Sequence, residues 1–348
     1  MKTTMMTGLL VAIAGTGVAS GQLEFQLVNQ IDLIATQDPA SDSFIGSNPS
    51  TVAWDGTDMY VAGWNNGRGD GTEHGIVQIA DAANSDALGT GFGLRPTNNF
   101  RGYLSLDVRD GRVAAAFENG GDDPQGLAIY DGATGTLEDS LNTRPTLANW
   151  DPANNGGNAV AWSQFGSGRL RVSDGGDLSN LIFDSSDGPV IFAGSTIQRG
   201  QDIDESGNIA LADGGGTVSY FERTGANSTA GAVTIASGIA AGNGNNVSIL
   251  NTSFGDFVLY NDRNAGNSFG DAVFAADIEG NAVSIDFGDL DTSIGTTGWF
   301  DYDYDAESGT LAVVEFGTRQ AFDFNVVPTP SSTALLGLAG LAAARRRR

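Results

Sequence analysis

The chain has 348 residues, no cysteine, one histidine and a formal net charge of −25 at pH 7. The lack of cysteine excludes disulfides and thiolate metal sites, and one histidine excludes a metal cage with two imidazoles. Apart from Lys2 and the four terminal arginines, 12 Arg stand against 42 acidic residues, a balance of −30. Such a charge repels nucleic acid and anionic membranes but attracts Ca²⁺ and cationic ligands, and it is also typical of salt-adapted surfaces.

Residues 1–21 have the layout of a secretory signal peptide. Lys2 precedes an uncharged apolar stretch from Met5 to Val18, and the small residues Ala19, Ser20 and Gly21 follow. We expect cleavage between Ala19 and Gln22, which predicts an exported protein.

Residues 22–326 are expected to form one all-β domain. Gly accounts for 50 residues and Pro for only nine, and Asp and Asn are abundant, which favours short strands joined by tight turns. A strand, a polar corner with a glycine and a second apolar strand recur six times. The spacings of about 51 residues are typical of four-stranded propeller blades. The six corner glycines are Gly56, Gly111, Gly168, Gly207, Gly255 and Gly309.

The two ends of this repeat complement each other. The sixth unit stops at its third strand, Gln320 to Val326, whereas a spare strand, Leu23 to Ile34, precedes the first unit. A shared blade would close the ring and remove the exposed sheet edge, with Phe25, Leu27 and Ile31 as anchors. The sequence therefore predicts a six-bladed β-propeller and resembles that superfamily in general. A seven-bladed ring, tandem β-sandwiches and a β-solenoid are the alternatives.

Three aspartates at alternate positions form the most site-like cluster. Asp301, Asp303 and Asp305 resemble the start of a Ca²⁺ loop, but Ala306 stands where such loops need glycine and Ala312 where they need glutamate. The same spacing is typical of a strand with aromatics on one face and carboxylates on the other. Like charges on one strand face favour a nearby cation or a wet channel. These three residues are therefore the candidate metal ligands, with Ca²⁺ as the possible metal.

Other polar residues carry weaker signals. His74 lies in a predicted Gly-rich loop and, as a lone histidine among polar residues, is expected to be solvated. Acidic loops between second and third strands predict a negative face that binds Ca²⁺ weakly. Two further acidic clusters are expected to shape turns: Asp202, Asp204 and Glu205, and Asp286, Asp289 and Asp291. No catalytic or cofactor-binding residue is assigned.

Residues 327–348 have the order of a sorting signal: a Pro-punctuated segment, the apolar run Thr333 to Ala344 and terminal arginines. As a helix the run would span about 18 Å, against roughly 30 Å for a bilayer core, so it is too short for a secure anchor. The arginines would hold its end on the cytoplasmic side. The signature residues are Val327, Pro328, Thr329, Pro330, Arg345, Arg346, Arg347 and Arg348.

This tail resembles the PEP-CTERM sorting signal of bacterial envelope proteins, although Thr329 stands where that signal has its glutamate. The resemblance implies an exosortase-type processing enzyme as a partner and transient contact with the inner membrane through the tail. It also implies a mature protein at the cell surface or outside the cell.

Two classes of function fit these observations. The first is a non-catalytic surface or matrix protein that binds a polysaccharide, a surface protein or Ca²⁺. The second is a Ca²⁺-dependent envelope hydrolase, phytase-like or lactonase-like, with its active site in the propeller channel. A hydrolase needs ligands from several blades plus a base or nucleophile, for which the sequence offers only Asp301, Asp303, Asp305, Asp202 and Asp204. We therefore expect a binding protein.

Overall fold

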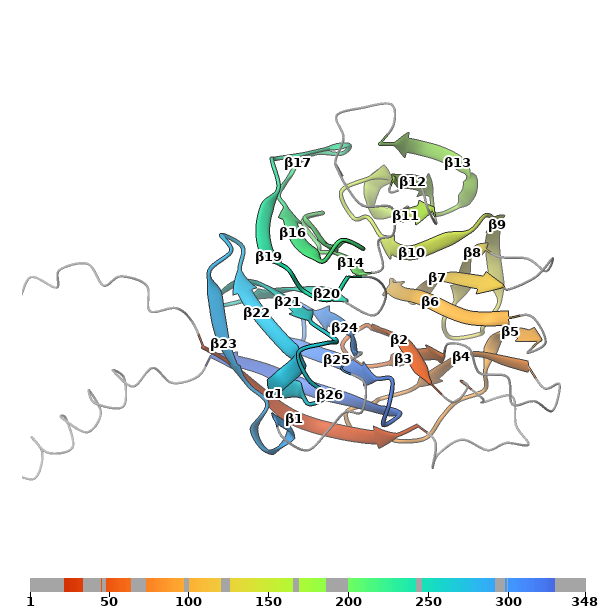
Figure 1. The fold of residues 1–348 in the computed structure, drawn as a ribbon. Coiled ribbons are helices and arrows are strands. Elements are labelled where there is room, and N and C mark those ends of the chain that lie inside the picture. The colour runs from red at the N-terminus through yellow and green to blue at the C-terminus, as the bar shows by residue number, and fades with distance from the viewer. Residues whose placement is uncertain are drawn as a thin grey trace, which may run out of the picture.

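The computed structural model describes residues 22–33, 45, 48–63, 73–96, 100–119, 126–164, 169–185, 200–241, 246–291, 298 and 300–328. It is an all-β structure in which four-stranded sheets surround a central axis like the blades of a propeller (Figure 1). The predicted all-β, six-bladed fold is confirmed. The two predicted targeting helices, and the sorting residues from Thr329 onward, lie outside the described residues. Within the described residues, no helix is long and apolar enough to cross a membrane.

Each blade is an antiparallel meander whose first strand lies innermost. Blade 1 contains β2 (Pro49–Trp54), β3 (Met59–Gly63), β4 (Glu73–Ile79) and β5 (Phe92–Pro96). Blade 2 contains β6 (Phe100–Arg109), β7 (Arg112–Asn119), β8 (Gly126–Asp131) and β9 (Leu137–Asn142). Blade 3 contains β10 (Pro145–Trp150), β11 (Ala159–Gln164), β12 (Leu170–Asp174) and β13 (Asp177–Asp184), with the 3-10 turn η1 (Asn155–Gly157) after β10.

The second half of the ring repeats this order. Blade 4 contains β14 (Gly200–Ile203), β15 (Ile209–Ala212), β16 (Thr217–Phe221) and β19 (Val233–Ser237), and carries the hairpin β17 (Arg223–Gly225) and β18 (Ser228–Thr229). Blade 5 contains β20 (Val247–Thr252), β21 (Gly255–Asn261), β22 (Val273–Asp277) and β23 (Ala282–Asp286), with α1 (Phe269–Ala272) before β22 and η2 (Gly288–Asp291) after β23. Blade 6 contains β24 (Phe300–Asp305), β25 (Thr310–Glu315), β26 (Gln320–Pro328) and, as its outer strand, β1 (Gln22–Asp32).

Strand β1 closes the ring as the sequence predicts. It pairs antiparallel with β26 and also runs parallel to β23, so blades 5 and 6 form one continuous sheet. Phe25 and Ile31 are buried, and Phe25 stacks on Phe287 with 4.3 Å between ring centroids. Leu27 was expected to be an anchor, and this is wrong, because its side chain is 43% exposed. The register shifts between Leu27 and Asn29, and this bulge breaks the alternation of inward and outward residues.

The core consists of apolar layers between adjacent blades. Central strands such as β7 are buried on both faces, and its residues Val113 to Phe117 form an unbroken apolar run. Alternate residues of β7 belong to different layers: Val113 and Ala115 pack toward blade 1, and Ala114 and Ala116 toward blade 3. The small residues expected for second strands thus let neighbouring sheets pack closely.

The assignment of the third unit from the sequence is wrong. Gly168 lies outside the described residues. Leu170 to Val172, which the repeat places in a second strand after this glycine, belong to the third strand β12. The second strand is β11, preceded by a corner in which Gly156 and Gly157 have φ of 65° and 89°. This corner is longer than the others. The repeat was therefore matched to Gly168, which follows β11 and fitted it by chance.

Candidate functional site: an acidic central channel

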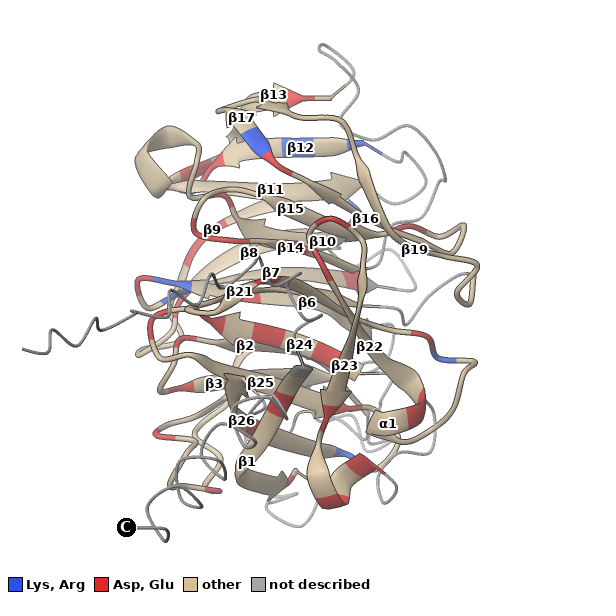
Figure 2. Ribbon diagram, turned by 90° about the vertical axis from the view of Figure 1, so that its left-hand side faces the viewer, with Lys and Arg blue, Asp and Glu red and all other residues tan. Residues whose placement is uncertain are grey.

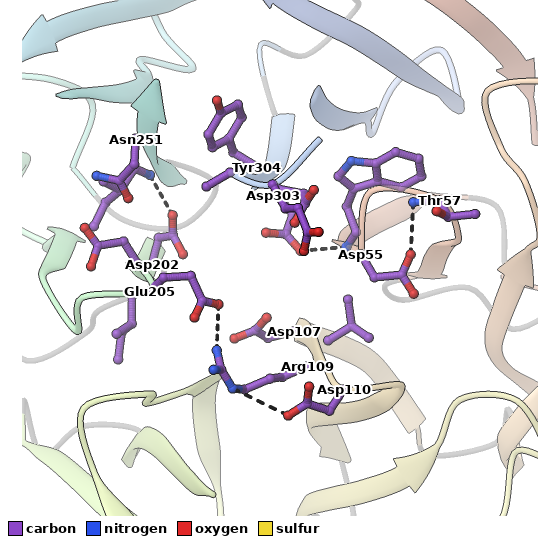
Figure 3. Close-up of a pocket in the computed structure, with 18 of the residues that line it drawn as sticks. Asp55, Thr57, Asp107, Arg109, Asp110, Asp202, Glu205, Asn251, Asp303 and Tyr304 are labelled. Carbon is purple, nitrogen blue, oxygen red and sulfur yellow. Dashed lines mark hydrogen bonds and ion pairs between the residues drawn. The ribbon is translucent and has the colours of Figure 1, made fainter. Parts of the chain in front are cut away.

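The innermost strands line a channel along the propeller axis. Its wide end, here called the mouth, is a cavity of about 640 Å³ bordered by turns between first and second strands (Figure 3). The narrow part, here called the neck, has about 20 Å³ and is lined by the inner strands β2, β6, β10, β14, β20 and β24. All six blades therefore contribute to one continuous central site.

The mouth is strongly negative. Arg109 is the single basic side chain among the described residues that line it. Its guanidinium lies 2.6 Å from Glu205 Oε1 and 3.9 Å from Asp110 Oδ2, so its charge is already shared between two carboxylates (Figure 3). The acidic residues that line the mouth are Asp55, Asp107, Asp110, Asp202, Asp204, Glu205, Asp303, Asp305 and Glu307. Seen from the side, the ribbon likewise carries many acidic residues in red and few basic ones in blue (Figure 2).

Three aspartates from alternate blades approach the axis where the mouth meets the neck (Figure 3). Asp107 of blade 2, Asp202 of blade 4 and Asp303 of blade 6 each accept a hydrogen bond from a backbone N–H of the next blade. The donors are Trp150, Ile249 and Trp54, each at 2.6 Å. Charge-assisted bonds of this length are strong, so each carboxylate ties its blade to the following one.

The candidate trio is divided between two roles. The predicted strand is confirmed as β24, with Phe300 and Tyr302 buried on one face. On the other face, Asp301 accepts the N–H of Val52 at 2.9 Å, one step below the bond from Trp54 to Asp303. Asp305 instead lies at the rim, where it accepts the N–H of Ser308 in the turn that follows β24.

The channel perturbs the acidity of its carboxyl groups. Loss of bulk water inside the channel, followed by repulsion from Asp202, raises the pKa of Asp107 to about 7. Burial also raises the pKa of Asp301 to about 7 and that of Asp202 to about 6. For Asp303, burial and then the charges of Asp107 and Asp202 raise the pKa well above its usual range. These four carboxyl groups therefore interact electrostatically, and they do not all carry a full charge near neutral pH.

The neck also contains buried amide and hydroxyl groups. Gln201 is 7% exposed, and its Nε2 donates to Asn149 Oδ1 at 3.0 Å. Its Oε1 has no hydrogen-bond partner among the described residues. The hydroxyl of Tyr302 also lacks one, but this ring packs in the core, on the face of β24 opposite Asp301 and Asp303. Asn246 Nδ2 donates to the carbonyl of Phe300 across the junction of blades 5 and 6. The neck thus combines four carboxylates with a polar side chain that is incompletely bonded.

No three carboxylate or imidazole groups of the described residues meet closely enough to hold a metal ion by themselves. In this structure Asp301 and Asp303 accept hydrogen bonds from backbone N–H groups of blade 1, and Asp305 accepts one within its own turn. Their role as metal ligands stays a prediction.

The sequence-based assignment of Asp202 to a turn is wrong, since it reaches Ile249 and the channel. A repeat of two blades would have identified it. Asp107 and Asp303 precede the corner glycines Gly111 and Gly309 as Asp202 precedes Gly207, at intervals of 95 and 101 residues. The six-unit repeat treats all blades alike, so it does not reveal an aspartate that recurs only in every second blade.

The remaining predictions have mixed outcomes. Asp204 and Asp286 do shape turns, through bonds from the N–H groups of Ser206 and Gly288. His74 lies in strand β4, opposite Arg95, so its placement in a loop is wrong. Of the nine acidic residues on which the negative face of the second-to-third-strand loops was predicted, three lie outside the described residues: Asp70, Asp122 and Asp123. Two follow second strands as expected, Asp213 and Asp262, and four lie within strands instead: Glu73, Glu118, Asp174 and Asp177. The acidic cavity that is described opens instead among the first-to-second-strand turns.

Comparison with known proteins gives no relative that would assign this channel a function. No protein-family model matches the chain, and no curated protein matches it significantly.

Proposed function

We propose that this protein is an exported, non-catalytic binding protein that recognises positively charged groups at the mouth of its channel. The observation that carries the proposal is the mouth itself, where nine carboxylates and one already paired arginine line about 640 Å³. A concave site lined by one sign of charge focuses the field and concentrates oppositely charged ligands. Basic segments of a surface protein and amine-bearing polysaccharides have the matching chemistry.

An aromatic ring adds to this preference. Tyr304, which is partly exposed, lines the same cavity as the carboxylates, whereas Trp54 borders it but is only 3% exposed and packs in the core. Aromatic faces attract ammonium and guanidinium groups, each contributing roughly 0.5–1 kcal/mol at exposed sites. A lysine or arginine side chain that enters the mouth would therefore meet both carboxylates and the ring of Tyr304.

A Ca²⁺-dependent hydrolase is the second candidate. One observation favours it: the pKa of Asp107 and Asp301 near 7 would suit a general acid or base at neutral pH. Both carboxyl groups, however, accept backbone N–H groups of neighbouring blades. Assays with phosphate monoesters and lactones in millimolar Ca²⁺ separate the two candidates, since turnover abolished by Asp107→Asn would favour the hydrolase.

Export and tail processing belong to the same proposal. The resemblance of residues 327–348 to a PEP-CTERM signal supports release from, or attachment to, the cell surface after an exosortase-type enzyme acts near Val327 to Pro330. We expect mass spectrometry of the protein from its native host to find a chain without Arg345–Arg348. An intact carboxyl terminus in the surface fraction would contradict processing.

The binding proposal is tested by titrating hexalysine into the protein at low salt. The test variant neutralises three exposed mouth residues: Asp110→Asn, Glu205→Gln and Glu307→Gln. The control variant neutralises three exposed acids that do not line the mouth: Asp86→Asn, Glu222→Gln and Asp289→Asn. Because both variants lose the same charge, a local site predicts weaker binding only in the first. Equal weakening in both would show attraction to the whole acidic surface instead.

A further inference from the structure

The neck is distinct from the mouth in size and chemistry. With about 20 Å³ it has room for about one water-sized body, since a single water needs roughly 10–15 Å³. Asp107, Asp202, Asp301 and Asp303 all border it, and no described residue that lines it is basic. Apart from protons bound by the carboxyl groups themselves, whatever offsets this negative charge must therefore be small and must come from outside the lining residues.

Carboxylates alone do not define a ligand site, but Gln201 adds a buried amide oxygen that lacks a hydrogen bond. This side chain lines the neck and is more than nine-tenths buried, and its amide oxygen is without a hydrogen-bond donor. An unmet buried acceptor costs about 1–3 kcal/mol, so its retention calls for a partner. The partner must present positive charge or a proton to an oxygen atom.

Repulsion among the carboxylates points in the same direction. Asp107, Asp202, Asp301 and Asp303 all line the same small neck, so the four carboxyl groups lie within electrostatic reach of one another. Each also uses one oxygen, Oδ2, to accept a backbone N–H: from Trp150, Ile249, Val52 and Trp54 respectively. Their orientation is therefore fixed by the ring and does not depend on a ligand.

We infer that the neck binds one hard divalent cation of the Ca²⁺ type, held by the carboxylates of Asp107, Asp202, Asp301 and Asp303 and by Gln201 Oε1. This site shares Asp107, Asp202 and Asp303 with the mouth, but it does not depend on the recognition of cationic groups proposed there. Ca²⁺ accepts 6–8 oxygen ligands that commonly include amide carbonyls and waters. Because no three carboxylates meet at one point, water from the adjoining mouth, which Asp107, Asp202 and Asp303 also line, completes the contact to some of them. Bound there, the ion links the inner strands of blades 2, 4 and 6.

Tb³⁺ is a suitable probe because it replaces Ca²⁺ and is sensitised by nearby aromatic rings, and Tyr302 lines the neck. The full chain is titrated with Tb³⁺, followed by competition with Ca²⁺, while the melting temperature is measured with and without Ca²⁺. We expect one saturable site and a Ca²⁺-dependent rise in melting temperature. Loss of a supporting group at a metal site lowers affinity by about ten- to hundredfold.

Two variants and one control locate the ion. Asp303→Asn keeps an oxygen acceptor for the Trp54 N–H while removing a charge, and Gln201→Leu keeps every carboxylate. We expect each to lower the affinity for Tb³⁺ at least about tenfold, and Glu307→Gln at the mouth to leave it nearly unchanged. If Asp303→Asn does not fold, Gln201→Leu decides alone. Absence of a saturable site, or equal affinity of Gln201→Leu and the parent, would overturn the inference. Loss of binding in Glu307→Gln alone would also overturn it, by placing the ion at the mouth.

Discussion

Alternate blades of this propeller play different parts at the channel. The inner strands of blades 2, 4 and 6 supply the carboxylates Asp107, Asp202 and Asp303, whereas those of blades 1, 3 and 5 supply the N–H groups that they accept. In blades 1 and 3 a tryptophan also donates a hydrogen bond to the preceding blade. The indole of Trp54 donates to the hydroxyl of Thr310 in blade 6, and that of Trp150 donates to the carbonyl of Arg112 in blade 2. The repeating unit at the channel is therefore a pair of blades. The carboxylates that make the channel negative are the same groups that link neighbouring blades by hydrogen bonds.

The largest effect is expected where the ring closes. Deleting residues 22–33 removes the outer strand of blade 6 and its pairing with β26 and β23. We expect the shortened chain to be insoluble or to melt far below the parent. Phe25→Ala tests the same joint more gently and should cost about 3–5 kcal/mol in a denaturant titration, because Phe25 packs on Phe287 and Phe324. A shortened chain as stable as the parent would contradict closure by β1.

The second-largest effect is expected from a change of pH, which alters the charge of carboxyl groups on blades 2, 4 and 6. The pKa values of Asp107, Asp202 and Asp301 are raised in the folded state, so the folded chain binds protons more tightly than the unfolded chain. Their stabilising contribution is complete below the ordinary pKa of 3.8 and is lost as the pH rises through about 6 to 7.

We therefore expect the melting temperature to be higher at pH 5 than at pH 7.5 in metal-free buffer, and Asp107→Asn to reduce the difference. Asp110→Asn, at an exposed residue, is the matched control. A melting temperature that rises over this range would contradict the assignment.

A single joint should contribute less. Asp107→Ala removes the acceptor of the Trp150 N–H and should cost about 1–3 kcal/mol, the usual penalty for leaving a buried donor unmet. Asp107→Asn keeps an oxygen acceptor in place and should cost much less. Denaturant titrations of both variants separate the contribution of the hydrogen bond to the free energy of unfolding from that of the charge. Equal losses would show that the carboxylate acts through its charge alone.

The smallest effect is expected at the corners. Gly111 has φ of 73° and open space around it, so Gly111→Ala should cost about 1–2 kcal/mol from backbone strain alone. Gly56 has φ of 84°, and a methyl group there would lie 2.5 Å from Asp305 Oδ2. Gly56→Ala should therefore cost more than Gly111→Ala in thermal melts, and the reverse order would contradict the contact between blades 1 and 6.

Much of the fold was predictable from the sequence because strand patterns and glycine corners are local features. The run Val113 to Phe117 and the aromatic alternation of Phe300 to Tyr304 needed no knowledge of neighbours. Leu27 was mispredicted because a bulge depends on how the partner strand is paired. Asp202 was mispredicted for a related reason, since its role requires Ile249 of another blade, 47 residues away, to lie beside it. The channel could therefore be found only after the blades were placed side by side.

The central claim is that the neck carboxylates serve two separable purposes, joining blades through an oxygen acceptor and binding cations through their charge. The triple variant Asp107→Asn, Asp202→Asn and Asp303→Asn keeps an acceptor at every joint and removes three charges. Calorimetric titration of hexalysine and of Ca²⁺ into this variant is the most direct measurement. We predict a folded protein, at least as stable as the parent at pH 7.5, that binds both probes much more weakly. A folded triple variant with unchanged binding of both probes would contradict the claim.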